Sequence, residues 1–301
     1  MCLPALNLFK EFNVPLVICG RAWAKSLLAG LRTEGFIEMT SSTMGNVRAL
    51  RQWRQEHPSH QNAILMPDSF SSALCFRLAG YKTAGWRDDG RSLLLTWPQT
   101  KPSESLHAVE AWFELAKRTL QLWGYDTTQS SLPSSLQLPI TNEHKQSAAA
   151  ALREAGLKTG KFVLIAPTAA GQHQGKRKVW PHFDALARVL QNNRIKVAMC
   201  TPLSEQAQAN RAAPTVDFIR PLDLGAFCAL TRMAQLVVCN DSGVAHLCAA
   251  AGARQLTLFG VTEAARTGPW TQNACSMGQN GRWPTTGEVV TRAQQMMSSN
   301  N

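Results

Sequence analysis

The stretch from Leu236 to Trp270 constrains the fold of this chain more than any other segment. It opens with LVVC, a short uncharged β-branched run that is typical of a buried parallel strand. The turn NDSG at 240–243 ends the run, and we expect an alanine-rich helix over 244–251 and a second strand over 255–259. Asp or Ser at such a turn caps the helix, and glycine lets a phosphate or another backbone come close. The pattern therefore predicts either an anion site at a helix N-terminus or simply a well-capped helix.

The same alternation of strand and helix continues through the rest of the chain. Before the opening stretch we expect strands over 14–19, 35–39, 63–66, 83–86, 162–166, 196–200 and 216–220. Helices are expected over 22–29, 46–56 (with Asn46 as its cap), 70–78, 106–123, 142–155, 181–191, 204–212, 225–234 and 288–297. A Ser/Thr/Gln/Pro-rich segment at 126–138 is typical of a linker. The alternation on both sides of it predicts two doubly wound α/β domains facing a cleft.

Composition excludes several classes of protein. With 45% hydrophobic and 17% charged residues in 301, the chain is typical of a soluble globular protein, and it has no apolar run long enough for a transmembrane helix. The start, MCLPALNLFKEF, does not resemble a signal peptide. Eight cysteines without a CxxC pair or a zinc spacing predict reduced thiols in a cytosolic protein without a structural metal.

The net charge of +11 calls for an anionic partner. Nucleic acid is one candidate, but the chain has no long Lys/Arg run and no nucleic-acid-binding motif. An anionic membrane face or an acidic glycolipid would explain the charge equally well. Charge alone does not separate these partners.

A second loop, 166–181, has the sequence APTAAGQHQGKRKVWP. It follows an expected strand and contains two glycines, Thr168 and the basic cluster Lys176, Arg177 and Lys178. Such a loop can neutralise a pyrophosphate as it becomes a leaving group. A solvated basic loop is the alternative interpretation.

The whole string NDSGVAHLCAAAGARQLTLFG, followed by TEAARTGP, closely resembles the ADP-heptose:lipopolysaccharide heptosyltransferases of glycosyltransferase family 9. MPDSFSSALCFRLAGYKTAGWRDDGR resembles a second segment of that family. The resemblance implies the GT-B architecture, with an acceptor-side domain at 1–135, a nucleotide-sugar domain at 140–285 and a last helix within 286–301 that packs back on the first domain. It also implies inverting transfer of heptose from ADP-heptose to a lipid A-Kdo or inner-core lipopolysaccharide acceptor, without metal or nucleic acid. The enzyme would be cytoplasmic and peripheral to the inner membrane.

Individual positions follow from the resemblance. It implies that Lys178, just before a Trp-Pro pair, stabilises the leaving group. The implied donor-binding residues are Thr168, Lys178, Glu205 at the ribose, Leu222 at the adenine, Asp241 at the sugar, Ser242 and Gly243 at the diphosphate, and His246. Glu205 is otherwise a partner of a helix dipole, and His246 a packed core histidine. Arg87 and Arg91, in a loop with Asp88 and Asp89, are implied at the acceptor, with solvated turn charges as the alternative.

The family begins with a strand that ends in Gly-Asp, whose aspartate is taken as the catalytic base. MCLPALNLFKEF matches the helix that follows this strand. A base must take the proton of the acceptor hydroxyl, and no residue of Met1–Pro4 can do so. We therefore expect the reading frame to continue upstream of Met1. A catalytically inactive nucleotide-sugar-binding paralogue is the alternative.

Overall fold

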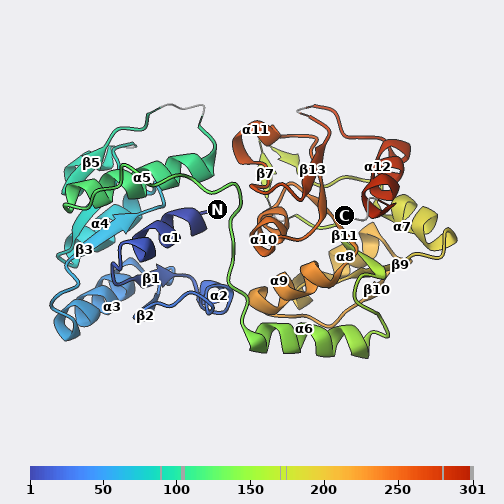
Figure 1. Ribbon diagram of the computed structural model, residues 1–301, viewed down its shortest axis with the longest axis horizontal. Coiled ribbons are helices and arrows are strands. Elements are labelled where there is room, and N and C mark those ends of the chain that lie inside the picture. Colours follow the sequence, from blue (N-terminus) through green and yellow to red (C-terminus); the bar gives the residue numbers. More distant parts are fainter. Residues whose placement is uncertain (89, 103–105, 170, 174, 280, 299–301) are drawn as a thin grey trace. The chain divides into compact units, whose positions relative to one another are not determined.

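The computed structural model describes residues 1–88, 90–102, 106–169, 171–173, 175–279 and 281–298, so that Asp89 lies outside the described residues. The chain divides into two compact units (Figure 1). Unit 1 comprises Met1–Lys25 and Arg32–Pro133, and unit 2 comprises Ser26–Leu31 and Ser134–Asn301.

Unit 1 is built from short parallel strands and amphipathic helices. Its elements are α1 (Leu3–Glu11), β1 (Val17–Gly20), α2 (Ala22–Leu27, which crosses into unit 2), β2 (Gly35–Glu38), α3 (Thr43–Glu56), β3 (Asn62–Leu65), α4 (Phe70–Leu78), β4 (Lys82–Trp86), η1 (Arg91–Leu94), β5 (Trp97–Gln99) and α5 (Ala108–Leu122). Successive side chains along a strand point to opposite faces of the sheet and pack into two apolar clusters. Ala63 packs with the α3–α4 cluster, whereas the next residue, Ile64, packs with the α1–α5 cluster.

The strands of unit 1 form two parallel sheets instead of the single doubly wound sheet that the alternation predicts. β1 pairs with β2, and β3, β4 and β5 form a separate sheet in that order. The α/β class with parallel strands is nevertheless confirmed.

The start of α3 corrects one predicted cap. The helix begins at Thr43, and the Ser42 side chain accepts a hydrogen bond from the Gly45 N–H at 3.1 Å. Asn46, predicted as the cap, lies buried within the first turn. Its Oδ1 accepts from the Thr40 N–H at 2.8 Å and its Nδ2 donates to the Thr40 carbonyl at 3.1 Å, which fixes the turn before the helix.

Unit 2 contains the larger sheet. Its elements are α6 (Asn142–Glu154), β6 (Phe162–Ala166), β7 (Gln172–His173), β8 (Lys176–Arg177), α7 (Phe183–Asn192), β9 (Lys196–Met199), η2 (Leu203–Glu205), α8 (Gln206–Ala212), β10 (Asp217–Phe218), α9 (Leu224–Met233), β11 (Leu236–Asn240), α10 (Gly243–Ala251), β12 (Gln255–Leu258), α11 (Ala264–Thr267), β13 (Ala274–Met277) and α12 (Thr286–Ser298). Six strands pair in parallel in the order β10-β9-β6-β11-β12-β13.

Both faces of this sheet are covered by helices, as a doubly wound fold requires. Val163 and Ile165 of β6 join the apolar cluster that α7 and α12 complete. Phe162 and Leu164 point the other way, into the cluster that α6, α9 and α10 complete. The central strands β6 and β11 are buried along their whole length.

The last helix packs differently from its predicted position. Val289, Ala293 and Met297 of α12 are buried in the same cluster as α7 and the sheet of unit 2. The apolar stripe of α12 is therefore used within unit 2, whereas the resemblance implied packing on the first domain. Among the described helices, none has the length and apolar composition that crossing a bilayer requires.

Candidate functional site

The strand order of unit 2 creates a topological switch point between β6 and β11. From β6 the chain runs to β9 and β10 on one side, and β11, β12 and β13 then fill the other side. The connections that follow β6 and β11 leave in opposite directions, which makes the carboxyl ends of these two strands a switch point. Open α/β sheets bind ligands at such a switch point. Thr168 follows β6 here, and Asp241 follows β11.

Three loops bring charged and polar groups together at this edge. Lys178 Nζ lies 2.6 Å from Asp241 Oδ2, and the Thr262 hydroxyl donates to the same oxygen at 2.5 Å. The Asp241 side chain is only 4% exposed and that of Lys178 is 21% exposed. The ion pair therefore joins the loop after β6 to the end of β11, and Thr262 adds the loop after β12.

Buried groups hold the Lys178 loop in place. The Trp180 N–H donates to Asn240 Oδ1 at 2.8 Å, and its indole N–H donates to the Pro284 carbonyl at 2.8 Å. Asn240 and Trp180 are both almost completely buried. Sequence reasoning did not assign these two positioning residues, although the polar Asn240 at the end of an apolar strand was the available signal.

A second polar pair lies one strand away. The Thr168 hydroxyl donates to Glu205 Oε2 at 2.5 Å. Thr168 is buried at the end of β6, and Glu205 is half-buried at the end of η2, beyond the neighbouring strand β9. The carboxylate is thus held at the same edge of the sheet as the Lys178–Asp241 pair.

The start of α10 supplies backbone groups at the switch point. Ser242 is its N-cap, and the Ser242 hydroxyl accepts from the Val244 N–H at 3.3 Å. A Cβ at Gly243 would meet nothing within 4 Å, so this glycine leaves open space in front of the first helical turn. A positive dipole end with open space in front of it suits an anion.

The other two predicted donor residues lie on flanking elements. Leu222 is partly buried against the apolar cluster of α6, α9 and α10. It precedes Asp223, which caps α9 by accepting from the Ala226 N–H at 3.0 Å. His246 lies half-buried on α10, one turn beyond its start.

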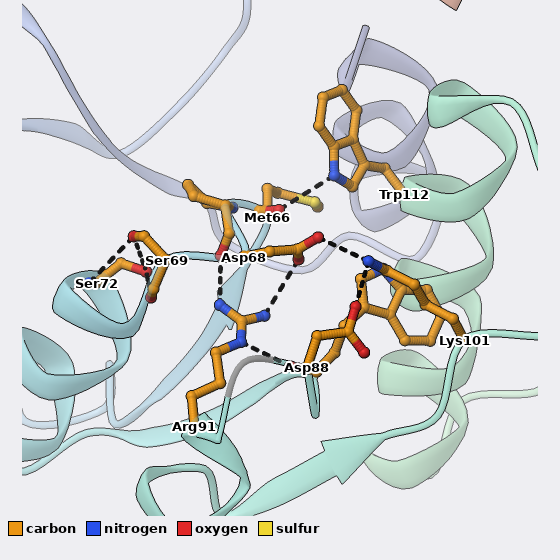
Figure 2. A network of polar contacts seen from close by, with 10 residues as sticks. Met66, Asp68, Ser69, Ser72, Asp88, Arg91, Lys101 and Trp112 are labelled. Carbon is orange, nitrogen blue, oxygen red and sulfur yellow. Dashed lines mark hydrogen bonds and ion pairs between the residues drawn. The ribbon is translucent and has the colours of Figure 1, made fainter. Parts of the chain in front are cut away.

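In unit 1, the two predicted acceptor arginines differ in environment. Arg87 is exposed, whereas Arg91 is completely buried. The Arg91 guanidinium donates to the Trp86 carbonyl at 2.7 Å, to the Pro67 carbonyl at 2.5 Å and to Asp68 Oδ1 at 3.3 Å (Figure 2). These hydrogen bonds hold the Arg91 guanidinium inside unit 1, so the structure gives Arg91 a positioning role in place of the predicted acceptor contact.

The carboxylates that follow β3 and β4 converge on one lysine. Figure 2 shows Lys101, just after β5, between Asp68 and Asp88. The Lys101 Nζ–Asp68 Oδ2 distance is 2.8 Å. Burial lowers the pKa of Lys101, but hydrogen bonds and charges from both carboxylates outweigh this effect and hold the pKa above its ordinary value. Together with Arg91, which pairs with Asp68, these groups form a charge-balanced network at the carboxyl ends of three neighbouring strands.

In the part of the chain that the structure describes, no group of three His, Cys, Asp or Glu side chains is arranged to hold a metal ion. All eight cysteines are free thiols. Burial raises the pKa of Cys19 and of Cys228 to about 12 in each case.

Comparisons with known proteins by family model and by structure point to one family. The family model described as "Glycosyltransferase family 9 (heptosyltransferase)" matches residues 50–295. No curated protein matches the chain. Among solved structures, E. coli ADP-heptose lps heptosyltransferase II superposes with a TM-score of 0.77 at 20% identity, covering 98% of this chain and 94% of that one. E. coli heptosyltransferase WaaC with ADP gives 0.74 at 19% identity, with 98% and 95% covered. A family 9 glycosyl transferase from Veillonella parvula gives 0.79 at 14% identity, with 99% and 94% covered.

Proposed function

This chain belongs to glycosyltransferase family 9, the heptosyltransferases, and on that premise we propose that it transfers a heptose from ADP-heptose to the inner core of lipopolysaccharide. The observation that carries the proposal is the Lys178–Asp241 ion pair at the switch point of unit 2. A lysine and a carboxylate at this point suit a donor that carries both a diphosphate and a hydroxyl-rich sugar.

The donor would lie across the carboxyl ends of β6 and β11. Its diphosphate would face Lys178 and the first turn of α10, and its ribose hydroxyls would donate to Glu205. Leu222 would contact the adenine. The similar WaaC structures were determined with ADP and with ADP-2-deoxy-2-fluoro heptose, which supports this class of donor.

Lys178 would act on the leaving group. As the bond from the sugar to the diphosphate breaks, negative charge grows on the ADP, and a preorganised ammonium in a partly buried site stabilises it. Asp241, which holds Lys178 in the free protein, would then accept hydrogen bonds from the sugar hydroxyls. The acceptor hydroxyl would give up its proton to a general base and displace ADP directly, so the anomeric carbon would invert, with the cationic loop in place of a metal.

The acceptor and the location follow from the same proposal. A lipid A-Kdo or inner-core acceptor is a glycolipid, so the enzyme would work at the cytoplasmic face of the inner membrane. The net charge of +11 favours contact with such an anionic surface.

Calorimetry with ADP-heptose, ADP and UDP-glucose, followed by a transfer assay with a Kdo-lipid acceptor, tests this function. We expect binding of the two adenine nucleotides and release of ADP on transfer. Binding without transfer to any inner-core acceptor would favour the alternative, a nucleotide-sugar-binding paralogue without catalysis. Absence of ADP-heptose binding would refute both.

A further inference from the structure

Three elements of unit 1 lie side by side over one apolar cluster. The inner sides of α3, α4 and η1 contribute to it, through Leu50, Phe76 and the partly buried Leu94 respectively. Helix α4 packs against both α3 and η1. The Arg51 guanidinium also joins the two helices, because it donates to the Leu78 carbonyl at 2.8 Å. Since the three elements cover the same cluster, their opposite sides form one outer face of unit 1.

This outer face exposes large apolar side chains. Leu93 on η1 is 90% exposed, and Met44 on α3 is 64% exposed. On α4, Phe70 and Leu78 are about half-exposed. Together with the partly buried Leu74 they follow one stripe of the helix at i, i+4 and i+8. Soluble proteins rarely leave apolar side chains of neighbouring elements together at the surface unless a partner covers them.

Arginines accompany these apolar side chains, whereas acidic residues are almost lacking. Arg48 on α3 and Arg77 on α4 are exposed, and neither forms an ion pair with a residue that the structure describes. Arg51 is exposed as well. Helix α4 and η1 contain no Asp or Glu, and the only acidic residue of α3 is Glu56 at its last position, which accepts from Gln52 at 2.9 Å. The face is therefore both apolar and cationic.

We propose that this outer patch docks the protein on an anionic lipid bilayer; the patch consists of Met44, Phe70, Leu74, Leu78 and Leu93 with Arg48 and Arg77. The apolar side chains would enter the boundary between headgroups and acyl chains. The guanidinium groups would pair with the phosphates of the lipids. The proposal adds a surface to the membrane location proposed above, and it does not depend on which sugar the enzyme transfers.

The arrangement of the patch favours a bilayer over other occupants. Its apolar side chains project from three separate elements, and a fluid bilayer accepts such separated anchors without a matching pocket for each one. A symmetric contact with a second copy would place one cationic face on another, which like charges oppose. An anionic lipid surface instead strengthens binding about fivefold for each arginine that approaches it.

Co-sedimentation of the full chain with lipid vesicles tests the proposal. One set of vesicles contains phosphatidylcholine alone, and the other also contains the anionic lipid phosphatidylglycerol. We expect binding to the anionic vesicles that weakens as the salt concentration rises, because salt screens the arginines. Phe70→Ser and Leu93→Ser should each lower the partition coefficient about tenfold, equivalent to about 1.4 kcal/mol. Arg48→Gln should lower it about fivefold.

Two substitutions outside the patch serve as matched controls. Leu122→Ser removes an apolar side chain about as exposed as Phe70 from α5, which packs into the other apolar cluster of unit 1. Arg153→Gln removes an exposed arginine from α6 of unit 2. Neither should change the partition coefficient. Circular dichroism should be the same for the parent chain and for every variant, since all the substituted side chains are exposed.

Several results would overturn the proposal. The absence of binding to anionic vesicles would do so and would leave an acidic protein as the partner of the patch. Equal binding to the neutral vesicles, or an unchanged partition coefficient in both Phe70→Ser and Leu93→Ser, would also contradict it. Self-association that Leu93→Ser abolishes, measured by analytical ultracentrifugation, would assign the patch to a second copy instead.

Calorimetry with ADP-heptose on the same samples separates this proposal from the proposed function, because the patch shares no residue with the donor site. Donor binding without vesicle binding would defeat the docking surface alone. Vesicle binding that depends on the patch, in a chain that does not bind ADP-heptose, would support the surface and defeat only the donor assignment.

Discussion

Replacing Arg91 with methionine should destabilise unit 1 and leave the nucleotide site intact. The change keeps an unbranched apolar stem but removes every donor to Trp86, Pro67 and Asp68. Trp86 is completely buried, so its carbonyl costs roughly 1–3 kcal/mol when it loses this donor, whereas Pro67 is exposed and its carbonyl can bond to water at little cost. The Asp68 carboxylate adds little, because it is 36% exposed and keeps its contact with Lys101.

Hydrogen-exchange mass spectrometry reads the two units separately and therefore suits this variant. Peptides that cover β4 and β5 should exchange faster by the factor that about 1–3 kcal/mol implies, at least about fivefold. Peptides from the sheet of unit 2 and the affinity for ADP should not change. Arg91→Lys should recover part of the loss, since an ammonium reaches fewer of the three acceptors than a guanidinium.

The matched control is Arg87→Met, which removes an exposed arginine from the same loop. We expect a change within about 0.5 kcal/mol, as for most surface substitutions. If Arg91→Met lowered the stability of unit 1 by less than about 1 kcal/mol, the guanidinium would not be holding the ends of β3 and β4, and the reasoning would be refuted.

Further outcomes follow from unit 2 and the thiols. Lys178→Ala and Asp241→Asn should each lower kcat about a hundred- to a thousandfold in the transfer assay, with circular dichroism unchanged; near-parental turnover in both would mean that the donor lies elsewhere. Glu205→Gln should raise the Kd for ADP in calorimetry but alter the Kd for inorganic pyrophosphate little, because in the proposed donor site only the nucleoside would contact this carboxylate. Burial raises the pKa of Cys19 and Cys228 from 9.0 to about 12, so the free energy of unfolding should fall as the pH rises from about 9 towards 12. A urea midpoint that stays constant over this pH range would contradict this expectation.

Much of unit 2 could be predicted from the sequence because its signals are local. The apolar runs of β6 and β11, the NDSG turn and the alanine-rich α10 encode strand, turn and helix within a few residues each. The positions of Lys178 and Asp241 came from the resemblance, whereas their direct pairing required the strand order. The hydrogen bond between Thr168 and Glu205 likewise could not be predicted from a local pattern, since 37 residues separate them in the chain.

Other features depended on tertiary packing that a local pattern does not contain. Asn46 and Ser42 are both good cap residues, and the buried hydrogen bonds of Asn46 to Thr40 decide between them. Arg91 occurs in a polar loop sequence, and only the fold places it under the ends of β3 and β4. The local sequence does not indicate a role for His107, which the structure shows as the N-cap of α5 in a capping box with Glu110.

The Lys178–Asp241 ion pair of unit 2 affects which ligand would bind most tightly. In unit 2, Lys178 is already neutralised by Asp241, so a diphosphate must displace a carboxylate from the ammonium before it gains the full interaction. Such an exchange costs little in net Coulomb energy, because one anion replaces another at a similar distance. It makes binding selective for a ligand that also gives Asp241 new hydrogen-bond donors, as a sugar attached to the diphosphate would. In the proposed site, ADP alone would pair with Lys178 but would leave Asp241 with Thr262 as its side-chain donor in the described loops. The Lys178–Asp241 pair would therefore favour the intact nucleotide sugar over the spent nucleotide, which is the preference that donor loading followed by product release requires.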